Sequence, residues 1–294
     1  MAKKNTKFKK RDLMGWLVML PTLILFAFFV WEPLIENVRL SLFKTVRYEI
    51  QDFVGVDNYI RVFQNPDFLA AFKNTFSYTF WSLLLGFFIP ILMGILISET
   101  IHMKSLFRIG VYFPNIVPGL ATIWIWSYFF IPGKTGVLNI ILGKLGVAPF
   151  DWLNNTVWTI PLIILVLTWK SAGSTALIYM ASISGINPEL YEAATIDGAG
   201  ILQRIRHILL PCITGLAKTM LILQIISVFQ ILYEPLVLKN GGPNNASISL
   251  MMLMYRFGYR DFDFSAAAAV SVIICVILII LSGFYMKLTA KKED

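Results

Sequence analysis

Long apolar stretches dominate this sequence and limit what the chain can fold into. Residues 74–98 contain no Asp, Glu, Lys or Arg, and residues 109–133 contain none either. A helix needs about 20 mainly apolar residues to cross the hydrocarbon core of a membrane. Only 14% of the residues are charged, whereas soluble domains carry about 25%. The sequence therefore predicts an integral membrane protein.

Six such stretches predict an all-α membrane protein with six transmembrane helices. They cover about residues 13–35, 72–98, 107–131, 157–186, 208–233 and 265–287. The fourth and fifth are each interrupted once, by Lys170 and Lys218. The chain has no repeat with a period of 20–50 residues. We therefore expect a basic head at 1–12, followed by one membrane domain at 13–294.

The basic residues predict the orientation of the chain. Six of the 25 lie in the first eleven positions, and an apolar stretch follows at once. With the N-terminus inside, the cytoplasmic segments hold 13 Lys and Arg residues, whereas the outer loop 32–71 holds four basic against six acidic residues. Cytoplasmic loops carry an excess of Lys and Arg. We therefore expect both termini in the cytoplasm, and we expect the basic head to anchor the chain at the membrane and bind no nucleic acid.

A polar insert at 187–211 separates the fourth and fifth stretches. Asn187 can cap a helix and Pro188 fits the first helical position. Gly198 can adopt the left-handed conformation that ends a helix. A second helix is expected to begin near Ile201 and to break or bend at Pro211. These capping residues alone fit an ordinary connecting loop as well as a docking element.

Seven residues of this insert have a spacing that resembles a known motif. They are Glu192, Ala193, Ala194, Gly198, Ile208, Leu210 and Pro211. The pattern is similar to the cytoplasmic motif of permease subunits of binding-protein-dependent ABC importers. The segments 54–59 and 240–247 resemble the carbohydrate branch, including the first permease subunit of maltose importers. That subunit has eight spans and a large periplasmic insertion, which this chain lacks.

The resemblance implies a type I ABC importer permease with a coupling helix at 187–197. This helix would lie in a groove of a cytoplasmic ATPase subunit, with Asp197 on the same face as the two alanines. The expected partners are a second, homologous but different permease, two ATPase subunits, an extracytoplasmic solute-binding protein and membrane lipid. The resemblance places the chain in the plasma membrane of a bacterium or archaeon as a multi-pass protein.

The chain is not expected to be an enzyme or to hold a cofactor, because the partner subunit would use the ATP. A P-loop needs Gly-x4-Gly-Lys-Ser/Thr. At Gly133-Lys134-Thr135 the residue five positions before the glycine is Tyr128, so the motif is incomplete. His102 and His207 are isolated in the sequence. We therefore expect no catalytic residues and no metal site.

Polar residues inside the fourth and fifth stretches are candidates for a solute pathway. Such residues are expensive in a membrane and usually face a cavity or another helix. The candidates are Lys170, Ser171, Ser174, Gln224, Ser227 and Gln230. Ser and Gln also join membrane helices, and that role fits equally well.

Lys170 has several alternative roles. It could line the path, where a cation would suit an acidic or phosphorylated sugar. It could instead reach the outer interface or pair with Glu234.

Two other functions remain open at this point. A permease of the same architecture could carry another polar solute, such as glycerol phosphate. An ion-driven secondary transporter would show inverted repeats, broken helices and carboxylates in mid-span. The chain has no such repeat, and Glu32, Glu99 and Glu234 all lie near the ends of the apolar stretches. The sequence thus favours a sugar importer powered by a separate ATPase.

Overall fold

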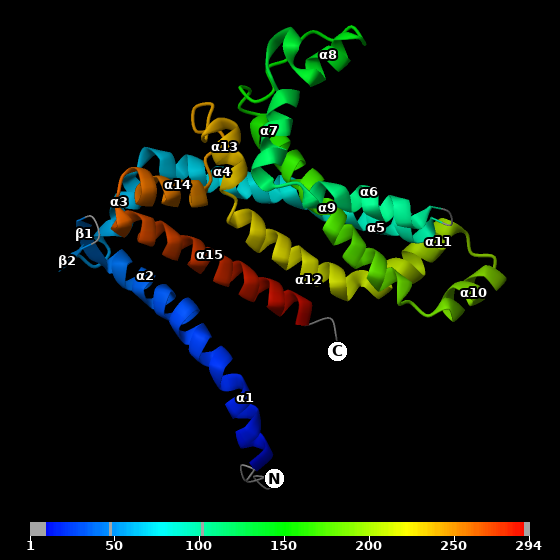
Figure 1. The fold of residues 1–294 in the computed structure, drawn as a ribbon, viewed down its shortest axis with the longest axis horizontal. Helices are drawn as coiled ribbons and strands as arrows, with labels where there is room; N and C mark the ends of the chain where they lie inside the picture. Colours follow the sequence, from blue (N-terminus) through cyan, green and yellow to red (C-terminus); the bar gives the residue numbers. More distant parts are fainter. Residues whose placement is uncertain (1–9, 47–48, 101–102, 291–294) are drawn as a thin grey trace.

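The structure, a computed structural model, is built almost entirely of helices (Figure 1). It describes residues 10–46, 49–100 and 103–290. Most of the basic head and the last four residues of the tail lie outside the described residues. Side chains are described from Met14 onward.

The elements of the first half of the chain are helices of different lengths with one β-hairpin. Their bounds are α1 (Lys10–Phe26), η1 (Ala27–Trp31), α2 (Glu32–Leu42), β1 (Phe43–Val46), β2 (Glu49–Phe53), α3 (Asp57–Gln64), α4 (Pro66–Ser82), η2 (Leu83–Phe87), α5 (Phe88–Glu99), α6 (Lys104–Ile116), α7 (Gly119–Phe129), η3 (Gly133–Thr135) and α8 (Val137–Gly143). The remaining elements are α9 (Thr159–Ser184), α10 (Pro188–Ile196), α11 (Ile201–Arg204), η4 (Ile205–Leu209), α12 (Leu210–Phe229), α13 (Tyr233–Lys239), α14 (Leu250–Tyr255), η5 (Arg256–Arg260) and α15 (Phe264–Ala290).

Within the described residues, five helical stretches are long and apolar enough to cross a membrane. They are Met14–Leu42, Pro66–Glu99, Thr159–Ser184, Ile201–Phe229 and Phe264–Thr289. A sixth results if α6 and α7 count together as one span.

The expected third helix, 107–131, is divided in two. Its halves α6 and α7 meet at an angle of 95°. Val117, between them, has an extended backbone with ψ of 130°. The residue before a proline avoids the helical conformation because the proline ring crowds it, and Pro118 follows directly. This break was not among the expected features of the third apolar stretch. We call it the third-span break.

A small β-hairpin also departs from the all-helical expectation. Strands β1 and β2 pair antiparallel, with Phe43 opposite Phe53. Asn58 at the start of α3 fixes the hairpin, because its amide nitrogen donates to the carbonyl oxygens of Ser41 and Phe43, both at 2.9 Å. The hairpin therefore joins α2 to α3 as a folded connection.

Helix α9 is the centre of the packed body. Its neighbours α5 and α6 approach it closely at glycines. A Cβ on Gly94 of α5 would lie 2.8 Å from the Cβ of Tyr179, and a Cβ on Gly173 of α9 would lie 1.9 Å from the carbonyl oxygen of Val111 on α6. Real Cβ atoms do not come this near. These two contacts therefore need glycine, and they set the spacing of the three helices.

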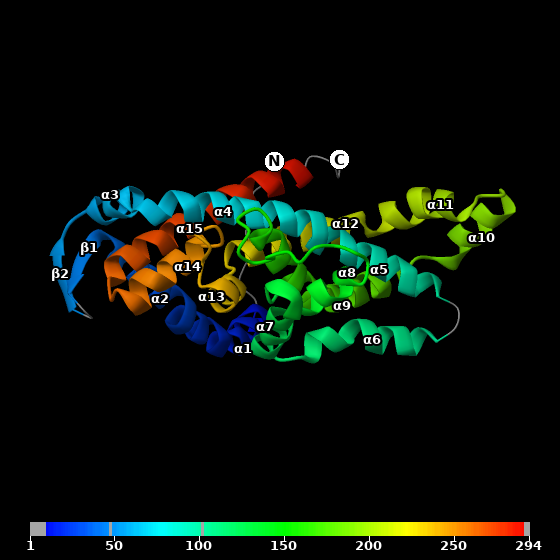
Figure 2. The same ribbon diagram turned by 90° about the horizontal axis from the view of Figure 1, so that it is seen from above.

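Three parts project from the body. Helix α8 and its loops form a lobe on one side, and α1 leaves the body on the opposite side (Figure 1). Helices α10 and α11 form an arm at one end, whereas the hairpin lies at the other end (Figure 2). The most apolar window of the first span has none of its residues buried within this chain. An apolar helix of this kind needs lipid or another protein to cover it.

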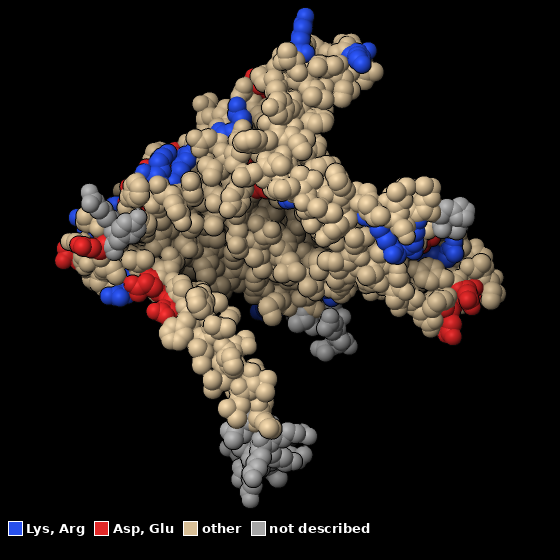
Figure 3. Space-filling model, viewed as in Figure 1, with Lys and Arg blue, Asp and Glu red and all other residues tan. Residues whose placement is uncertain are grey.

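Charged side chains gather away from the middle of the molecule. On the face shown in Figure 3, they cluster at the hairpin end, on the α8 lobe and around the arm, whereas the centre and the part of α1 that is not grey are almost free of charge. Placing a charged side chain in the hydrocarbon core of a membrane costs much free energy, whereas an apolar side chain is stable there. The charge-poor zone is therefore suited to lie within the membrane.

Candidate functional site

The arm formed by α10, α11 and their turn contains most of the predicted coupling residues. The side chain of Asn187 caps α10, accepting a hydrogen bond from the backbone N–H of Glu189 at 3.1 Å. Gly198 follows the helix with φ of +75°. The backbone N–H of Gly200 then donates to the side chain of Gln203 at 2.8 Å, which starts α11. The predicted cap, the left-handed glycine and the second helix near Ile201 are thus confirmed.

The arm is exposed, including its apolar residues. Glu192, Ala193, Asp197 and Gly198 are exposed, and Ala194 is half-buried. Several large apolar side chains at this tip are also exposed, among them Ile196 at 86% and Leu202 at 80%. Exposed apolar groups among polar ones are typical of a protein contact surface.

The other three motif residues lie outside the tip of the arm. Ile208 belongs to the π-helical segment η4, and Leu210 and Pro211 begin α12. The helix continues from Ile201 to Phe229 as one stretch, so it does not break at Pro211. The π-helical segment η4 ends directly before Leu210, and the regular α-helical pattern of α12 begins again at Leu210-Pro211.

Tyr191 connects the arm to the body, and the sequence analysis missed it. Its hydroxyl is buried and makes no hydrogen bond to the described part of the chain. Burial raises the pKa of Tyr191, and the nearby Glu99 and Cys212 raise it further, whereas Arg204 lowers it. The charged and polar groups that affect Tyr191 belong to the end of α5, the start of α12 and α11. The sequence signal that could have identified Tyr191 is a large aromatic residue within a short helix of the polar insert.

A polar hollow of about 240 Å³ lies between η2, α9 and α12. Three of the predicted pathway residues line it, namely Ser171, Gln224 and Ser227. Two further lining residues, Thr175 and Tyr179, are polar residues of the fourth apolar stretch that were noted in the sequence but not chosen as pathway candidates. They follow Ser171 at helical intervals of four, which supports their position on the same face. The remaining lining residues were not predicted, and they are Gly86, Phe87, Leu167, Met220 and Leu223.

The hollow combines fixed and unsatisfied polar groups. Gln224 donates its amide N–H to the hydroxyl of Ser82. Gly86 makes room for this amide, because a Cβ there would lie 2.6 Å from its nitrogen. Tyr179 is fully buried, and its hydroxyl finds no hydrogen-bond partner among the described residues. A buried hydroxyl without a partner costs free energy, so this group can bind a ligand or water favourably.

Lys170 and Ser174 lie at the third-span break instead of the hollow. The Lys170 amino group donates to the carbonyl oxygen of Val117 at 2.5 Å and of Asn115 at 3.5 Å. The Asn115 amide donates to the Ser174 hydroxyl at 3.3 Å. Lys170 forms no ion pair with Glu234 among the described residues. Burial raises the pKa of Glu234, and its own backbone hydrogen bond and the Lys170 charge oppose that shift.

Gln230 is also separated from the hollow. It ends α12 and lines a different, mostly apolar groove of about 540 Å³. Met251 and Met254 of α14 and Ser271 of α15 share this groove. The predicted pathway residues therefore divide into three groups: Ser171, Gln224 and Ser227 line the hollow, Lys170 and Ser174 lie at the third-span break, and Gln230 lines the apolar groove.

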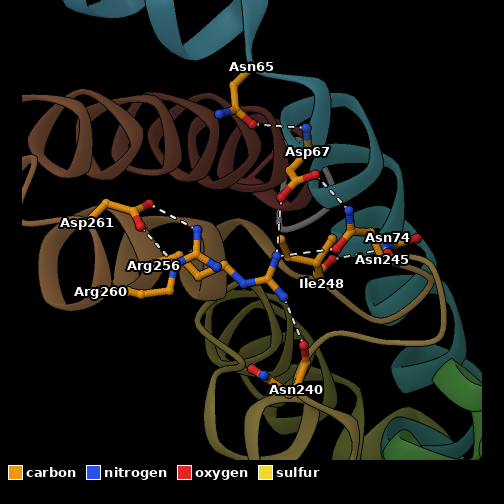
Figure 4. Close-up of polar contacts among 9 residues, drawn as sticks. All are labelled: Asn65, Asp67, Asn74, Asn240, Asn245, Ile248, Arg256, Arg260 and Asp261. Atoms are coloured by element: carbon orange, nitrogen blue, oxygen red, sulfur yellow. Dashed lines mark hydrogen bonds and ion pairs between the residues drawn. The ribbon is translucent and has the colours of Figure 1, made fainter.

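A polar bracket, formed by Asp67, Asn74, Asn240, Asn245 and Arg256, fastens the segment 240–247 to the body (Figure 4). Arg256 pairs with Asp67 at 3.2 Å and donates to the Asn240 carbonyl oxygen at 2.8 Å. Asn245 donates its amide N–H to Asp67 at 2.7 Å. Asn74 donates to the Asn245 carbonyl oxygen at 2.7 Å. Residues from three separate parts of the chain thus hold this loop in one conformation.

Comparison with known proteins decides the family. Residues 86–292 match the family described as binding-protein-dependent transport system inner membrane component. The chain belongs to this family. The matched region contains both the polar hollow and the arm.

Several relatives in this family are transport permeases with sugar substrates in their names. The chain is 30% identical to the arabinooligosaccharides transport system permease protein AraP of Bacillus subtilis over 246 residues, which cover 83% of this chain and 78% of that protein. It is 31% identical to the trehalose/maltose transport system permease protein MalF of Thermococcus litoralis, over 85% of both chains.

A solved structure has the same fold along almost the whole chain. It is the crystal structure of a bacterial ABC transporter involved in the import of the acidic polysaccharide alginate. The TM-score is 0.85 with 29% identity, covering 97% of this chain and 98% of that chain. The alginate transporter in complex with an alginate pentasaccharide-bound periplasmic protein matches with a TM-score of 0.83 and 29% identity, over 96% of both chains.

Proposed function

We propose that this chain is the transmembrane permease subunit of an ABC importer that carries a sugar or oligosaccharide into the cytoplasm by alternating access. One observation carries the proposal: the match to the permease family spans both the polar hollow and the exposed arm. The sugar relatives and the alginate transporter support a saccharide as the solute.

The arm is the part of the chain suited to receive energy from an ATPase. We infer that α10 is the coupling helix of a coupling loop at 187–211, with Glu192, Ala193, Ala194, Asp197 and Gly198 at the contact. Exposed apolar side chains beside these residues support a protein contact. The separate ATPase would bind and hydrolyse the ATP, and this subunit would move the solute without catalysing a reaction.

A second permease would complete the pathway. The first span has an unburied apolar window, and Ser227 in the hollow is exposed. Both features suit a homologous but different subunit packed against this face. A hollow of about 240 Å³ is also smaller than the roughly 300–1,000 Å³ of complete ligand sites.

The remaining partners follow from the family. The alginate transporter binds a periplasmic protein, and we propose an extracytoplasmic solute-binding protein for this chain also. Two ATPase subunits would lie at the cytoplasmic side. We place the chain in the plasma membrane of a bacterium or archaeon as a multi-pass protein, with a basic cytoplasmic head at 1–12.

Reconstitution tests this function directly. The complete complex in liposomes, with its binding protein, should import a radiolabelled oligosaccharide only when ATP is inside with the ATPase subunits. A control complex carries an ATPase variant that binds but does not hydrolyse ATP. Import that continues in that control, or that follows an ion gradient instead, would contradict the proposal.

A further inference from the structure

A π-helical turn, η4, lies where the arm joins α12. A π-turn closes its hydrogen bond five residues back along the chain instead of four, so it holds one residue more than an α-turn. In η4 the backbone N–H of Leu210 donates to the carbonyl oxygen of Ile205. Each residue of an α-helix turns the chain by about 100°. One residue more or less in this turn therefore changes the direction in which the arm faces.

Pro211 explains why the wide turn occurs at this place. In a regular α-helix, the residue at this position would donate to the carbonyl oxygen of His207. Proline has no N–H for this bond, and its ring crowds the carbonyl group four residues before it. The wider turn relieves this crowding. The first span repeats the arrangement, because the backbone N–H of Glu32 donates to the carbonyl oxygen of Ala27 in η1, and Pro33 follows directly.

The extra residue in η4 turns Arg204 toward the body. Leu209 and Ile213 mark the core side of the helix, since they are 0% and 1% exposed. Counted back from Leu209 along a regular α-helix, Arg204 would point about 140° away from the core side. When the π-turn takes up one residue, this angle is about 40°. The structure agrees with the second count, because Arg204 is half-buried and its charge acts on Tyr191.

Packing alone does not choose between these two rotations of the arm. Ile205 packs against the apolar cluster that contains Leu209 and Ile213. It lies within about 60° of the core side whether or not the turn holds an extra residue. The contact of Ile205 is therefore compatible with both rotations, and Pro211 is the residue that distinguishes them.

We propose that Pro211, acting through η4, is a positioning residue that sets the rotation of the arm relative to α12. This inference rests on the proposed function, in which α10 contacts the ATPase. In the observed rotation Glu192 and Asp197 are exposed for that contact. A rotation of about 100° at η4 would displace α10, which the turn at 197–200 ties to α11, while α12 keeps its place in the membrane.

A photo-cross-linking amino acid at Ile196 reports this rotation without knowledge of the solute. Ile196 ends α10 and is 86% exposed, so the probe does not disturb packing within this chain. In the complete complex, the otherwise wild-type arm should form an adduct with an ATPase subunit. Pro211→Ala restores the missing N–H, so η4 can close to an α-turn. If about one-tenth of the arms keep the observed rotation, the adduct yield should fall about tenfold.

Pro66→Ala is the matched control for this variant. Pro66 and Pro211 are both exposed and both stand in the first turn of their helices. Asn65, before Pro66, has an extended backbone instead of a π-turn. The control should therefore form the adduct at the wild-type yield. A yield for Pro211→Ala equal to that of the control would overturn the proposal.

A compensating deletion separates the rotation of the arm from a general loss of stability. His207 is exposed within η4. Its removal from the Pro211→Ala chain leaves an α-helix with one residue fewer, which again points Arg204 about 40° from the core side. The double variant should regain the wild-type adduct yield, whereas a merely structural role of Pro211 predicts a further loss. A double variant that yields no more adduct than Pro211→Ala would overturn the proposal.

An insertion keeps the proposal testable if Pro211→Ala does not assemble. One alanine between Arg206 and His207, with Pro211 retained, turns the arm by about 100° and should also lower the adduct yield. A wild-type yield in this variant would overturn the role of η4.

Import by the same complexes distinguishes this inference from the proposed function. Radiolabelled maltotriose and arabinotriose are the probes. Import should fall and recover together with the adduct yield in Pro211→Ala and in the double variant. The expected adduct yields without ATP-dependent import of either probe by the wild-type complex would contradict the sugar-importer function and leave the role of Pro211 standing. Absence of any adduct between the wild-type arm and the ATPase would overturn both.

Discussion

Three residues on one face of α9 hold the third-span break. Lys170 binds the carbonyls at the end of α6, Gly173 allows α6 to touch, and Ser174 accepts a hydrogen bond from Asn115. They are spaced at i, i+3 and i+4, so they share a face. Lys170 and Ser174 were also candidates for a solute path, because both are polar residues inside an apolar stretch. The sequence does not distinguish lining a solute path from holding the third-span break, because the difference depends on where the neighbouring helix α6 ends.

At Gly173 the structure predicts a strong effect of one added methyl group. Gly173→Ala would place a Cβ 1.9 Å from the Val111 carbonyl oxygen, so α6 must move away from α9. Overpacking of this kind costs about 1–3 kcal/mol. We expect a lower midpoint of thermal unfolding for the purified complex.

Gly185→Ala is the matched control for this experiment. Gly185 follows the same helix, but the atom nearest to its added Cβ is 3.5 Å away. The control should unfold at the wild-type midpoint. Equal midpoints for both variants would show that α6 and α9 are not in close contact.

At the scale of elements, the turn between α10 and α11 depends on Gly198. Its φ is +75°, and nothing lies within 4 Å of an added Cβ, so backbone strain is the main cost of a substitution. A β-branched residue avoids this conformation, whereas Asn tolerates it. The strain is about 1–2 kcal/mol.

Gly198→Val should therefore uncouple transport from ATP hydrolysis, and Gly198→Asn should not. We expect about tenfold slower import by Gly198→Val, because its strain disfavours the turn that presents α10. ATPase activity and import are measured on the same proteoliposomes. Normal import by the Val variant would argue against a coupling role for the arm.

The polar bracket at segment 240–247 offers a comparison between two arginines (Figure 4). The Arg256 side chain is 12% exposed in its pair with Asp67, whereas Arg260 is 62% exposed in its pair with Asp261. Exposed pairs contribute about 0–1 kcal/mol. Hydrogen bonds to charged groups in less exposed positions contribute about 1.5–3 kcal/mol.

Arg256→Ala should consequently loosen the loop 240–249, whereas Arg260→Ala should leave it unchanged. Amide hydrogen exchange measures the difference, with about tenfold faster exchange expected in the loop of the first variant only, for a loss of at least 1.4 kcal/mol. Equal protection in both variants would mean that Arg256 does not hold the loop.

Features that depend on adjacent residues could be predicted from the sequence, whereas features that depend on residues distant in the chain could not. The cap at Asn187 and the turn at Gly198 were predictable, because each depends on its immediate neighbours. The bracket was not, since Asp67 and Arg256 are 189 positions apart. The break at Pro118 had a local signal in the proline. The stretch 107–131 was nevertheless predicted to be one helix, because the residues on both sides of this proline are apolar.

At the scale of the whole molecule, the uncovered first span predicts a contact with the second permease. Leu25 is 57% exposed within this chain. A photo-cross-linking amino acid at this position should yield an adduct with the second permease when both are co-expressed. Cross-links to lipid alone, in the assembled complex, would show that the first span faces the bilayer.

The family, the fold class and the helical spans were within reach of sequence because they depend on long apolar stretches and one spaced motif. The grouping of Ser171 with Gln224 and Ser227, and the separation of Gln230, needed the packing of α9 against α12. Helical periodicity shows on which face of its own helix a residue lies. It does not show which other helix packs against that face.

The unbroken helix from Ile201 to Phe229 makes the arm and the polar hollow two ends of one lever. At 1.5 Å per residue, Gln224 stands about 35 Å along the axis from Ile201. A tilt of about 5° around the Ile201 end would move Gln224 by roughly 3 Å, close to the length of one hydrogen bond. Small rotations at the ATPase surface would therefore suffice to make or release a contact with the solute.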